Sequence, residues 1–174
     1  MHLVAPSAQH KESFLEALRE YQKEDSEIKT DLNFLNIPLL EKDFQSYINM
    51  LFNISLGKNL PSGYVPETTY WLVDGDEYIG RIGIRHTLNE SLLREGGHVG
   101  YNIRPSRRQQ GFGTKILSLG LPKIKELGIE KALVTCDENN VGSKKIIVAN
   151  GGIFENSVEM SQGRPRKLRY WIIL

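Results

Sequence analysis

A chain of 174 residues with 40% hydrophobic and 25% charged residues has the composition of a single globular domain with a sizeable core. Lys and Arg number 22 against 21 Asp and Glu, a balance that argues against nucleic acid or an anionic membrane as the main partner. Cys136 is the only cysteine, which excludes a disulfide within the chain. The first residues carry no secretion signal and no apolar run is long enough to span a bilayer, so we expect a cytoplasmic protein.

The first third of the sequence predicts a short strand followed by two amphipathic helices. Residues 3–4 are the strand, and Ser7 is placed to cap the first helix. Apolar residues recur at helical spacing over 40–51, which predicts the second helix. The acidic stretch 22–33 is interpreted as solvated surface, because runs of charge usually are, and steering of a cationic substrate is the alternative.

A β-hairpin is predicted in the middle of the chain. Residues 68–73 and 78–85 read as strands, and Asp74-Gly75 between them is a turn signal. The loop 55–67 contains several Gly and Pro residues and is long enough to be a flap on the substrate side. Residues 88–96 are interpreted as a plain connection.

The most informative segment predicts a strand, a basic turn with two glycines, and a helix. The strand covers 97–103, and the helical pattern follows Gly113. The first N–H groups of a helix lack internal partners and carry partial positive charge, so an anion binds there readily. Gly111 and Gly113 remove side chains that would keep a ligand from the backbone. Basic residues gather at the same point: Arg104, Arg107, Arg108 and Lys115.

The last third predicts further strands around a short helix. Pro122 should kink or end the long helix early, because proline has no N–H to donate. A strand at 132–136 follows, then a short helix over 140–150. Residues 153–154 and 168–173 are the closing strands. Helices thus cover a mixed sheet whose strands meet at one central crevice.

The Arg-x-x-Gly-x-Gly spacing of residues 108–113, after a strand that ends in Arg104-Pro105, resembles the acyl-CoA pyrophosphate loop of the GNAT superfamily of N-acetyltransferases. The segment 140–143, Asn-Val-Gly-Ser, followed by a helix that stops at Gly151, extends the resemblance to about residues 68–157. Further segments resemble an uncharacterised bacterial-type subgroup of that superfamily: 65–73, 85–89, 96–101 and 168–172.

The resemblance implies an α/β (α+β) fold of one domain over residues 1–174. Its mixed, mostly antiparallel central sheet is flanked by helices. Two parallel strands, 97–103 and 131–136, splay apart and form the crevice for acyl-CoA. Acetyl-CoA is then the cosubstrate, and no metal is expected.

The same resemblance implies how acetyl-CoA is held. Backbone groups of Asn102 and Ile103 bond the pantetheine arm, and Arg107 or Lys115 meets the 3′-phosphate. The N–H groups around the pyrophosphate belong to Arg108, Gln109, Gln110, Gly111, Phe112, Gly113 and Thr114.

Asn140 and Ser143 are the remaining cofactor-binding candidates. The resemblance implies that Asn140 bonds the pantetheine and that Ser143 lies close to it. The residues alone also favour Asn140 as a helix N-cap, and the two roles are compatible. Cys136 is interpreted as a small buried strand residue rather than an acyl-carrying nucleophile, because it has no obvious His partner.

An alkylammonium has a pKa of roughly 10.4, so a base must remove a proton before the amine attacks a thioester. Glu95 and His98 flank the central strand and are the leading candidates, and His86 and Glu67 at the ends of the neighbouring strands are also considered, although a strand histidine is more often structural. Glu67, Arg85 and His86 lie where the neighbouring strands end and are assigned to substrate binding.

A general acid is harder to assign. Family members often carry a Tyr seven residues after the Asn, but this chain has Ile147 there. The alternatives are Tyr101, Tyr170, water, or protonation of the thiolate after its release. Strand alternation puts Tyr101 and His98 on opposite faces and leaves open which face meets the substrate.

Three hypotheses follow. The leading one is transfer of an acetyl group from acetyl-CoA to an amino group of a small molecule or protein by direct attack. The alternative, motivated by Ile147, is a non-catalytic acyl-CoA-binding or regulatory module. The third is an adapter that forms a homodimer through the edge strand 168–174.

Overall fold

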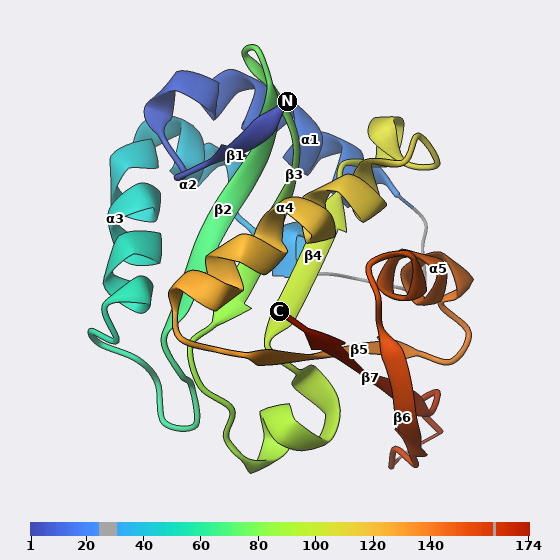
Figure 1. The fold of residues 1–174 in the computed structure, drawn as a ribbon. Coiled ribbons are helices and arrows are strands. Elements are labelled where there is room, and N and C mark those ends of the chain that lie inside the picture. The colour runs from blue at the N-terminus through green and yellow to red at the C-terminus, as the bar shows by residue number, and fades with distance from the viewer. Residues whose placement is uncertain (25–30, 162) are drawn as a thin grey trace.

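A computed structural model describes residues 1–24, 31–161 and 163–174 (Figure 1). The strands are β1 (His2–Val4), β2 (Glu67–Asp74), β3 (Glu77–Arg85), β4 (Val99–Ile103), β5 (Lys131–Asp137), β6 (Ile153–Val158) and β7 (Lys167–Ile173). The longer helices are α1 (Lys11–Lys23), α2 (Ile37–Lys42), α3 (Phe44–Ser55), α4 (Phe112–Glu126) and α5 (Val141–Ala149). Short helical turns are η1 (Ala8–His10), η2 (Asp31–Phe34), η3 (Leu92–Gly96) and η4 (Pro105–Arg107).

The strands form two antiparallel sheets. The first has the order β1-β2-β3-β4, and the second has the order β5-β7-β6. The predicted hairpin is confirmed as β2 and β3, which pair up to Asp74 opposite Glu77. The predicted mostly antiparallel sheet flanked by helices is therefore correct, with the addition that it is divided in two.

Helices cover both faces of the first sheet (Figure 1). One face packs against α1, α2 and α3, where the rings of Phe14 and Trp71 stack with centroids 4.7 Å apart. The other face packs against α4, and this layer also includes β5, β7 and Ile147 of α5. Gly120 of α4 allows this close packing, because a Cβ there would lie 2.4 Å from Cδ1 of Ile82. The first sheet is therefore buried on both faces.

β4 and β5 diverge from a single junction. The His98 N–H donates to the Leu133 carbonyl at 2.7 Å, and the Leu133 N–H donates to His98 Nδ1 at 2.9 Å. Within the described residues no ladder continues from there, and Figure 1 shows the two strands pointing in different directions. Strand β4 begins at Val99 rather than at 97, because Gly97 has a φ of +67° and lies against Leu133. The predicted splay is present.

Two predictions for the N-terminal helices are corrected. Ser7 makes no side-chain cap, and α1 begins only at Lys11, after η1. The helix predicted over 40–51 is two helices, because Asp43 caps a new one by accepting from the Ser46 N–H at 3.1 Å. The amphipathic pattern continued across this break, because both helices bury apolar residues on the same core.

Pro122 does not end α4, which runs unbroken from Phe112 to Glu126. The buried apolar residues on either side, Leu117 and Ile124, hold the helix against the sheet and outweigh the lost hydrogen bond. The predicted plain connection before β4 contains η3, a π-helical turn.

The edge-strand hypothesis for dimerisation is wrong in its choice of strand. β7 lies between β5 and β6 and is hydrogen-bonded on both sides, so it offers no free edge. The outer strands of this sheet are β5 and β6, and a homodimer stays a prediction without an assigned surface.

Within the described residues, no helix has both the length and the apolar character needed to cross a membrane.

The acidic stretch 22–33 is described only in part, because residues 25–30 lie outside the described part of the chain. Asp31, at its end, forms an ion pair with Arg81 at 2.6 Å rather than standing alone in solvent.

Candidate active site

The predicted pyrophosphate loop joins β4 to α4. Its conformation is set by two left-handed residues, Gln109 with a φ of +60° and Gly111 with a φ of +82°. No side chain caps α4, so the N–H groups of its first turn face outward without a side-chain partner. Gly113 lies against α5, where an added Cβ would be 2.4 Å from Cδ1 of Ile146. Gly113 therefore serves helix packing as well as access to the backbone.

A cavity of about 560 Å³ lies between this loop, the end of β4 and the start of α5. It collects most of the predicted cofactor-binding residues, which come from the end of β4, the loop before α4 and the start of α5. Its lining is Tyr101, Asn102, Ile103, Arg108, Gln109, Gly111, Gly113, Thr114, Asn140, Gly142, Ser143 and Ile146. We call it the donor cavity. Gln110 and Phe112 belong to the same loop but do not line it.

Ion pairs fix the arginines that surround the loop. Arg104 is buried and binds Glu20, which also accepts from the Ser106 N–H at 3.0 Å. Burial opposes ionisation of Glu20, but the hydrogen bonds from Arg104 and Ser106 prevail and lower the pKa of this carboxyl. Arg107, expected at the 3′-phosphate, is bound to Glu77 at 2.7 Å.

Arg108 is the loop arginine that faces the donor cavity. It pairs with Glu24 of the segment after α1 and donates to the Ile103 carbonyl at 3.1 Å. Lys115 lies one turn into α4 and is exposed. Arg108 and Lys115 thus place solvent-accessible positive charge beside the first turn of α4.

A hydrogen-bonded chain of three residues closes the inner end of the donor cavity. Asn140 caps α5, because its Oδ1 accepts from the Ser143 N–H at 2.9 Å. The Ser143 Oγ and the Tyr101 hydroxyl are 2.6 Å apart and hydrogen-bonded. Burial raises the pKa of Tyr101 to about 12, although the bond to Ser143 lowers it, so the phenol keeps its proton at neutral pH. Ile147, in the place of the family's tyrosine, is fully buried in the core.

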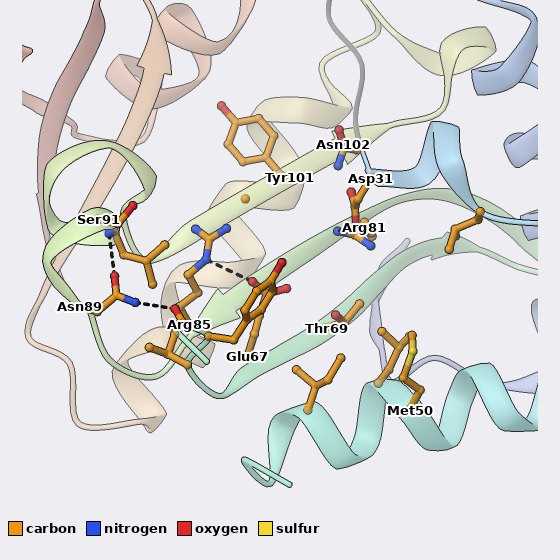
Figure 2. Close-up of a pocket in the computed structure, with 18 of the residues that line it drawn as sticks. Asp31, Met50, Glu67, Thr69, Arg81, Arg85, Asn89, Ser91, Tyr101 and Asn102 are labelled. Carbon is orange, nitrogen blue, oxygen red and sulfur yellow. Dashed lines mark hydrogen bonds and ion pairs between the residues drawn. The ribbon is translucent and has the colours of Figure 1, made fainter. Parts of the chain in front are cut away.

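A second cavity of about 620 Å³ lies on the opposite face of β4, between the first sheet, α3 and the loops around Tyr64 and Leu92. We call it the acceptor cavity (Figure 2). Its floor consists of β2, β3 and β4 residues that share one face of the sheet by strand alternation. These are Glu67, Thr69, Arg81, Arg85, Gly100 and Asn102.

Two ion pairs lie on this floor, as Figure 2 shows for Arg85 and Glu67. The Arg85 Nε is 3.3 Å from Glu67 Oε2, and its Nη1 donates to the carbonyls of Gly96 and Gly97 at 3.1 and 3.0 Å. The second pair is Arg81 with Asp31. Each arginine here is paired with a carboxylate, so the formal charges of the residues that line the cavity sum to zero.

The two cavities share Tyr101 and Asn102. Alternation along β4 points these neighbours to opposite faces, so this short stretch separates a space beside the phosphate loop from a space beside Glu67. The face of Gly100 and Asn102 lines the acceptor cavity. A group transferred across β4 at this point would pass between the two cavities.

The other predicted catalytic and substrate residues lie outside both cavities. The Glu95 carboxylate pairs with Arg164 at 3.3 Å. His98 uses its Nδ1 at the junction with β5, and burial lowers its pKa. The His86 Nε2 and the Thr68 hydroxyl are hydrogen-bonded at 2.8 Å. Their catalytic or binding roles stay predictions.

Sequence reasoning missed half of the acceptor cavity. Arg81 and Asp31 form one of its ion pairs, and Tyr47, Met50 and Leu51 of α3 form its apolar wall. The available signal was the position of Arg81, which shares a strand face with Gly83 and Arg85 in a segment that otherwise reads as buried. A charged residue on a buried face requires a partner, and that partner could have been sought.

Cys136 is buried, and burial raises the pKa of its thiol to about 11, which fits the structural interpretation. Among the described residues, no three His, Cys, Asp or Glu side chains are grouped so that they could hold a metal ion.

Residues 4–153 match the family model described as an acetyltransferase (GNAT) domain. No curated protein sequence matches the chain.

Several solved structures share the fold. The microcin C7 self immunity acetyltransferase MccE, in complex with acetyl-CoA and AMP, aligns over 99% of this chain and 91% of its own, with a TM-score of 0.70 and 14% identity. The ribosomal L7/L12 alpha-N-protein acetyltransferase RimL, in complex with coenzyme A, aligns over 99% and 93%, with a TM-score of 0.68 and 15% identity. A spermidine N-acetyltransferase SpeG chimera from Vibrio cholerae and hSSAT aligns over 98% and 93%, with a TM-score of 0.64 and 16% identity.

Because these identities are low, the solved structures support the fold alone. The family model matches the sequence itself over most of the chain. The family model confirms the predicted family and the predicted enzyme class, an acetyltransferase. From its sequence match over residues 4–153 and its fold, the chain belongs to the GNAT acetyltransferase family.

Proposed function

We propose that the protein transfers an acetyl group from acetyl-CoA to an amino group of a small molecule or protein by direct nucleophilic attack. The observation that carries this proposal is the meeting of the donor and acceptor cavities at Tyr101 and Asn102. Holding two reactants in attack geometry supplies much of the acceleration in such a reaction. A wall of two residues between the cavities is suited to that task.

The donor cavity has the features that a pyrophosphate needs. The first turn of α4 has no side-chain cap, and the space around Gly111 is open, with no atom within 4 Å of an added Cβ. Unpaired N–H groups at a helix start bind anions, and Arg108 adds charge. Asn102 and Ile103 offer the backbone of β4, which β5 leaves free beyond His98. These residues fit acetyl-CoA, which supplies a thioester carbonyl when it is bound.

Tyr101 takes the role of proton donor in this proposal. Its phenol is protonated at neutral pH and is oriented by Ser143. It lines the donor cavity, where a sulfur leaving group would need a proton. The buried Ile147 then leaves no gap in the mechanism, since Tyr101 provides a hydroxyl from β4 instead of α5.

Glu67 takes the role of amine-binding group and base. Its carboxylate lies on the acceptor floor, whereas Glu95 and His98 are occupied elsewhere. A carboxylate binds an incoming ammonium and can accept its proton directly or through water. Glu95 and His98 remain the alternative bases.

The proposal is tested by two measurements on the same protein. Calorimetry measures acetyl-CoA binding, and thiol release is then followed across amines, amino acids and peptides. We expect binding in the micromolar range and release of thiol with at least one acceptor class. Absence of binding would overturn the proposal, and binding without turnover on every acceptor would favour the non-catalytic module that Ile147 suggested.

A further inference from the structure

On the acceptor floor, an unused donor group of Arg85 and an unused acceptor atom of Glu67 lie on neighbouring side chains that form an ion pair. Three contacts hold the Arg85 guanidinium, two through Nη1 and one through Nε. Its Nη2 makes no hydrogen bond within the described residues and points to β4, 3.7 Å from where a Cβ on Gly100 would lie. Arg85 therefore presents one unused N–H₂ group in a fixed orientation.

Glu67 completes the arrangement. Its Oε2 faces Arg85, and its Oε1 lies against Gly83, where an added Cβ would be 2.4 Å away. Within the described residues Oε1 has no hydrogen-bond partner. The absence of a side chain at Gly83 thus admits the Glu67 carboxylate and that at Gly100 leaves Nη2 of Arg85 uncovered, and both Glu67 and Arg85 line the acceptor cavity.

A ligand with a single charge is poorly matched to this floor. A simple amine would be attracted by Glu67 and repelled by Arg85, and a simple carboxylate would meet the reverse. A polyamine would bring further positive charges into a cavity whose carboxylates are each already matched by an arginine. An ammonium and a carboxylate on the same carbon satisfy both unused atoms at once.

The side of the cavity formed by α3 is apolar, whereas Thr69, Asn89 and Ser91 add polar groups elsewhere on its lining. Tyr47, Leu51 and Ile54 of α3 and Leu92 of η3 face the same cavity, whose volume of about 620 Å³ leaves space for a large side chain. Such a wall favours apolar groups through burial and selects little else.

We propose that the acceptor is a free α-amino acid with a bulky apolar side chain, with its carboxylate on Arg85 and its amine on Glu67. This inference rests on the proposed function, because the amine on Glu67 is the one that would be acetylated. The carboxylate then lies beside Gly100 of β4 and the amine on the Gly83 side of the floor, within the cavity that shares Tyr101 and Asn102 with the donor cavity.

The test uses matched probes and two readouts. Leucine, leucinamide, isoamylamine, a peptide that begins with Leu, and spermidine are titrated by calorimetry into the protein saturated with coenzyme A, and are assayed for acetylation. We expect leucine to bind at least about tenfold more tightly than the amide, the decarboxylated amine or the peptide, because only leucine engages both charges. Equal or tighter binding of any of these probes would overturn the inference.

Variants separate the carboxylate contact from general damage. Gly100→Ala places a methyl group at ordinary contact distance from the Arg85 Nη2 and should reduce the preference for leucine over leucinamide toward unity. Arg85→Gln should do the same, whereas Arg94→Gln, whose side chain reaches the Glu159 carbonyl outside the cavity, should leave it unchanged. A preference that survives in Gly100→Ala and Arg85→Gln would overturn the assignment.

The two readouts keep this inference distinct from the proposed function. Selective leucine binding without acetylation would support the amino-acid site and overturn the proposed reaction. Acetylation that favours leucinamide, the peptide or spermidine would support the reaction and overturn the amino-acid site.

Discussion

The donor and acceptor cavities are built in different ways although they share a strand. The donor cavity consists mainly of backbone from one continuous loop and the starts of two helices, and its glycines and helix caps lie within a few residues of each other. The acceptor cavity includes charged and aromatic side chains that meet from distant segments, as Arg81 and Asp31 do across 50 positions. A site built on backbone tolerates change poorly at glycines, whereas a site built on side chains can be altered one residue at a time.

The largest expected effect is on the donor side. Gly111→Asp should weaken acetyl-CoA binding by at least about a hundredfold, because a carboxylate near a pyrophosphate costs several kcal/mol. Gly128→Asp is the matched control, since Gly128 has a φ of +80° against +82° for Gly111 and also lies in open space, but at the other end of α4. Calorimetry should show near-normal binding for the control. Equal binding by both variants would show that the loop is not the pyrophosphate site.

The shared wall gives the next effect. Tyr101→Phe removes the proton donor and should lower kcat by about a hundredfold with little change in acetyl-CoA affinity. Because burial raises the pKa of Tyr101 to about 12, the wild-type rate should show no decline near pH 10 from its ionisation. Steady-state kinetics across pH measure both. A variant that retains the wild-type kcat would leave the proton to water.

Glu67→Gln should act on the acceptor alone. We expect kcat/KM for the acceptor to fall about tenfold at neutral pH, with acetyl-CoA affinity unchanged. The loss should shrink as pH rises toward the amine pKa of roughly 10.4, because less base is then needed. Glu95→Gln is the control, since its carboxylate pairs with Arg164 outside both cavities. A larger loss in Glu95→Gln than in Glu67→Gln would assign the base to Glu95.

The smallest effect concerns the support of the loop. Glu20→Gln weakens the contacts with Arg104 and Ser106, but the side chain is partly solvated, so we expect a loss of less than about 1 kcal/mol in the free energy of unfolding at neutral pH. The pKa of Glu20 is lowered in the fold, so its contribution is present above the ordinary carboxyl pKa and disappears as pH falls through the lowered value. Urea unfolding at several pH values should show the two proteins converging in acid. A constant difference across pH would contradict this linkage.

The sequence predicted what is encoded locally. Three local features could be predicted without the fold, because each depends on residues a few positions apart. They are the hairpin turn, the loop at 108–114 and the Asn140 cap. The family match then confirmed the fold that this loop implied.

The rest depended on contacts between distant segments. The Arg81–Asp31 pair joins a strand to a helical turn. The sequence around Arg81 indicates that it needs a partner but does not identify Asp31 as that partner. The persistence of α4 through Pro122 follows from burial on the sheet, which outweighs local propensity. The interior position of β7 is a matter of strand order, which apolar patterning does not encode.

The order of the lining residues along the chain has a consequence for specificity. The acceptor cavity is lined by residues from Asp31 to Asn102, and the donor cavity by residues from Tyr101 to Ile146. The two sets overlap only at the middle of β4. A single recombination point within this strand would therefore exchange the choice of acceptor and leave the use of the donor intact. Under the proposed function, substrate choice would thus be inherited, or engineered, as one continuous piece of sequence.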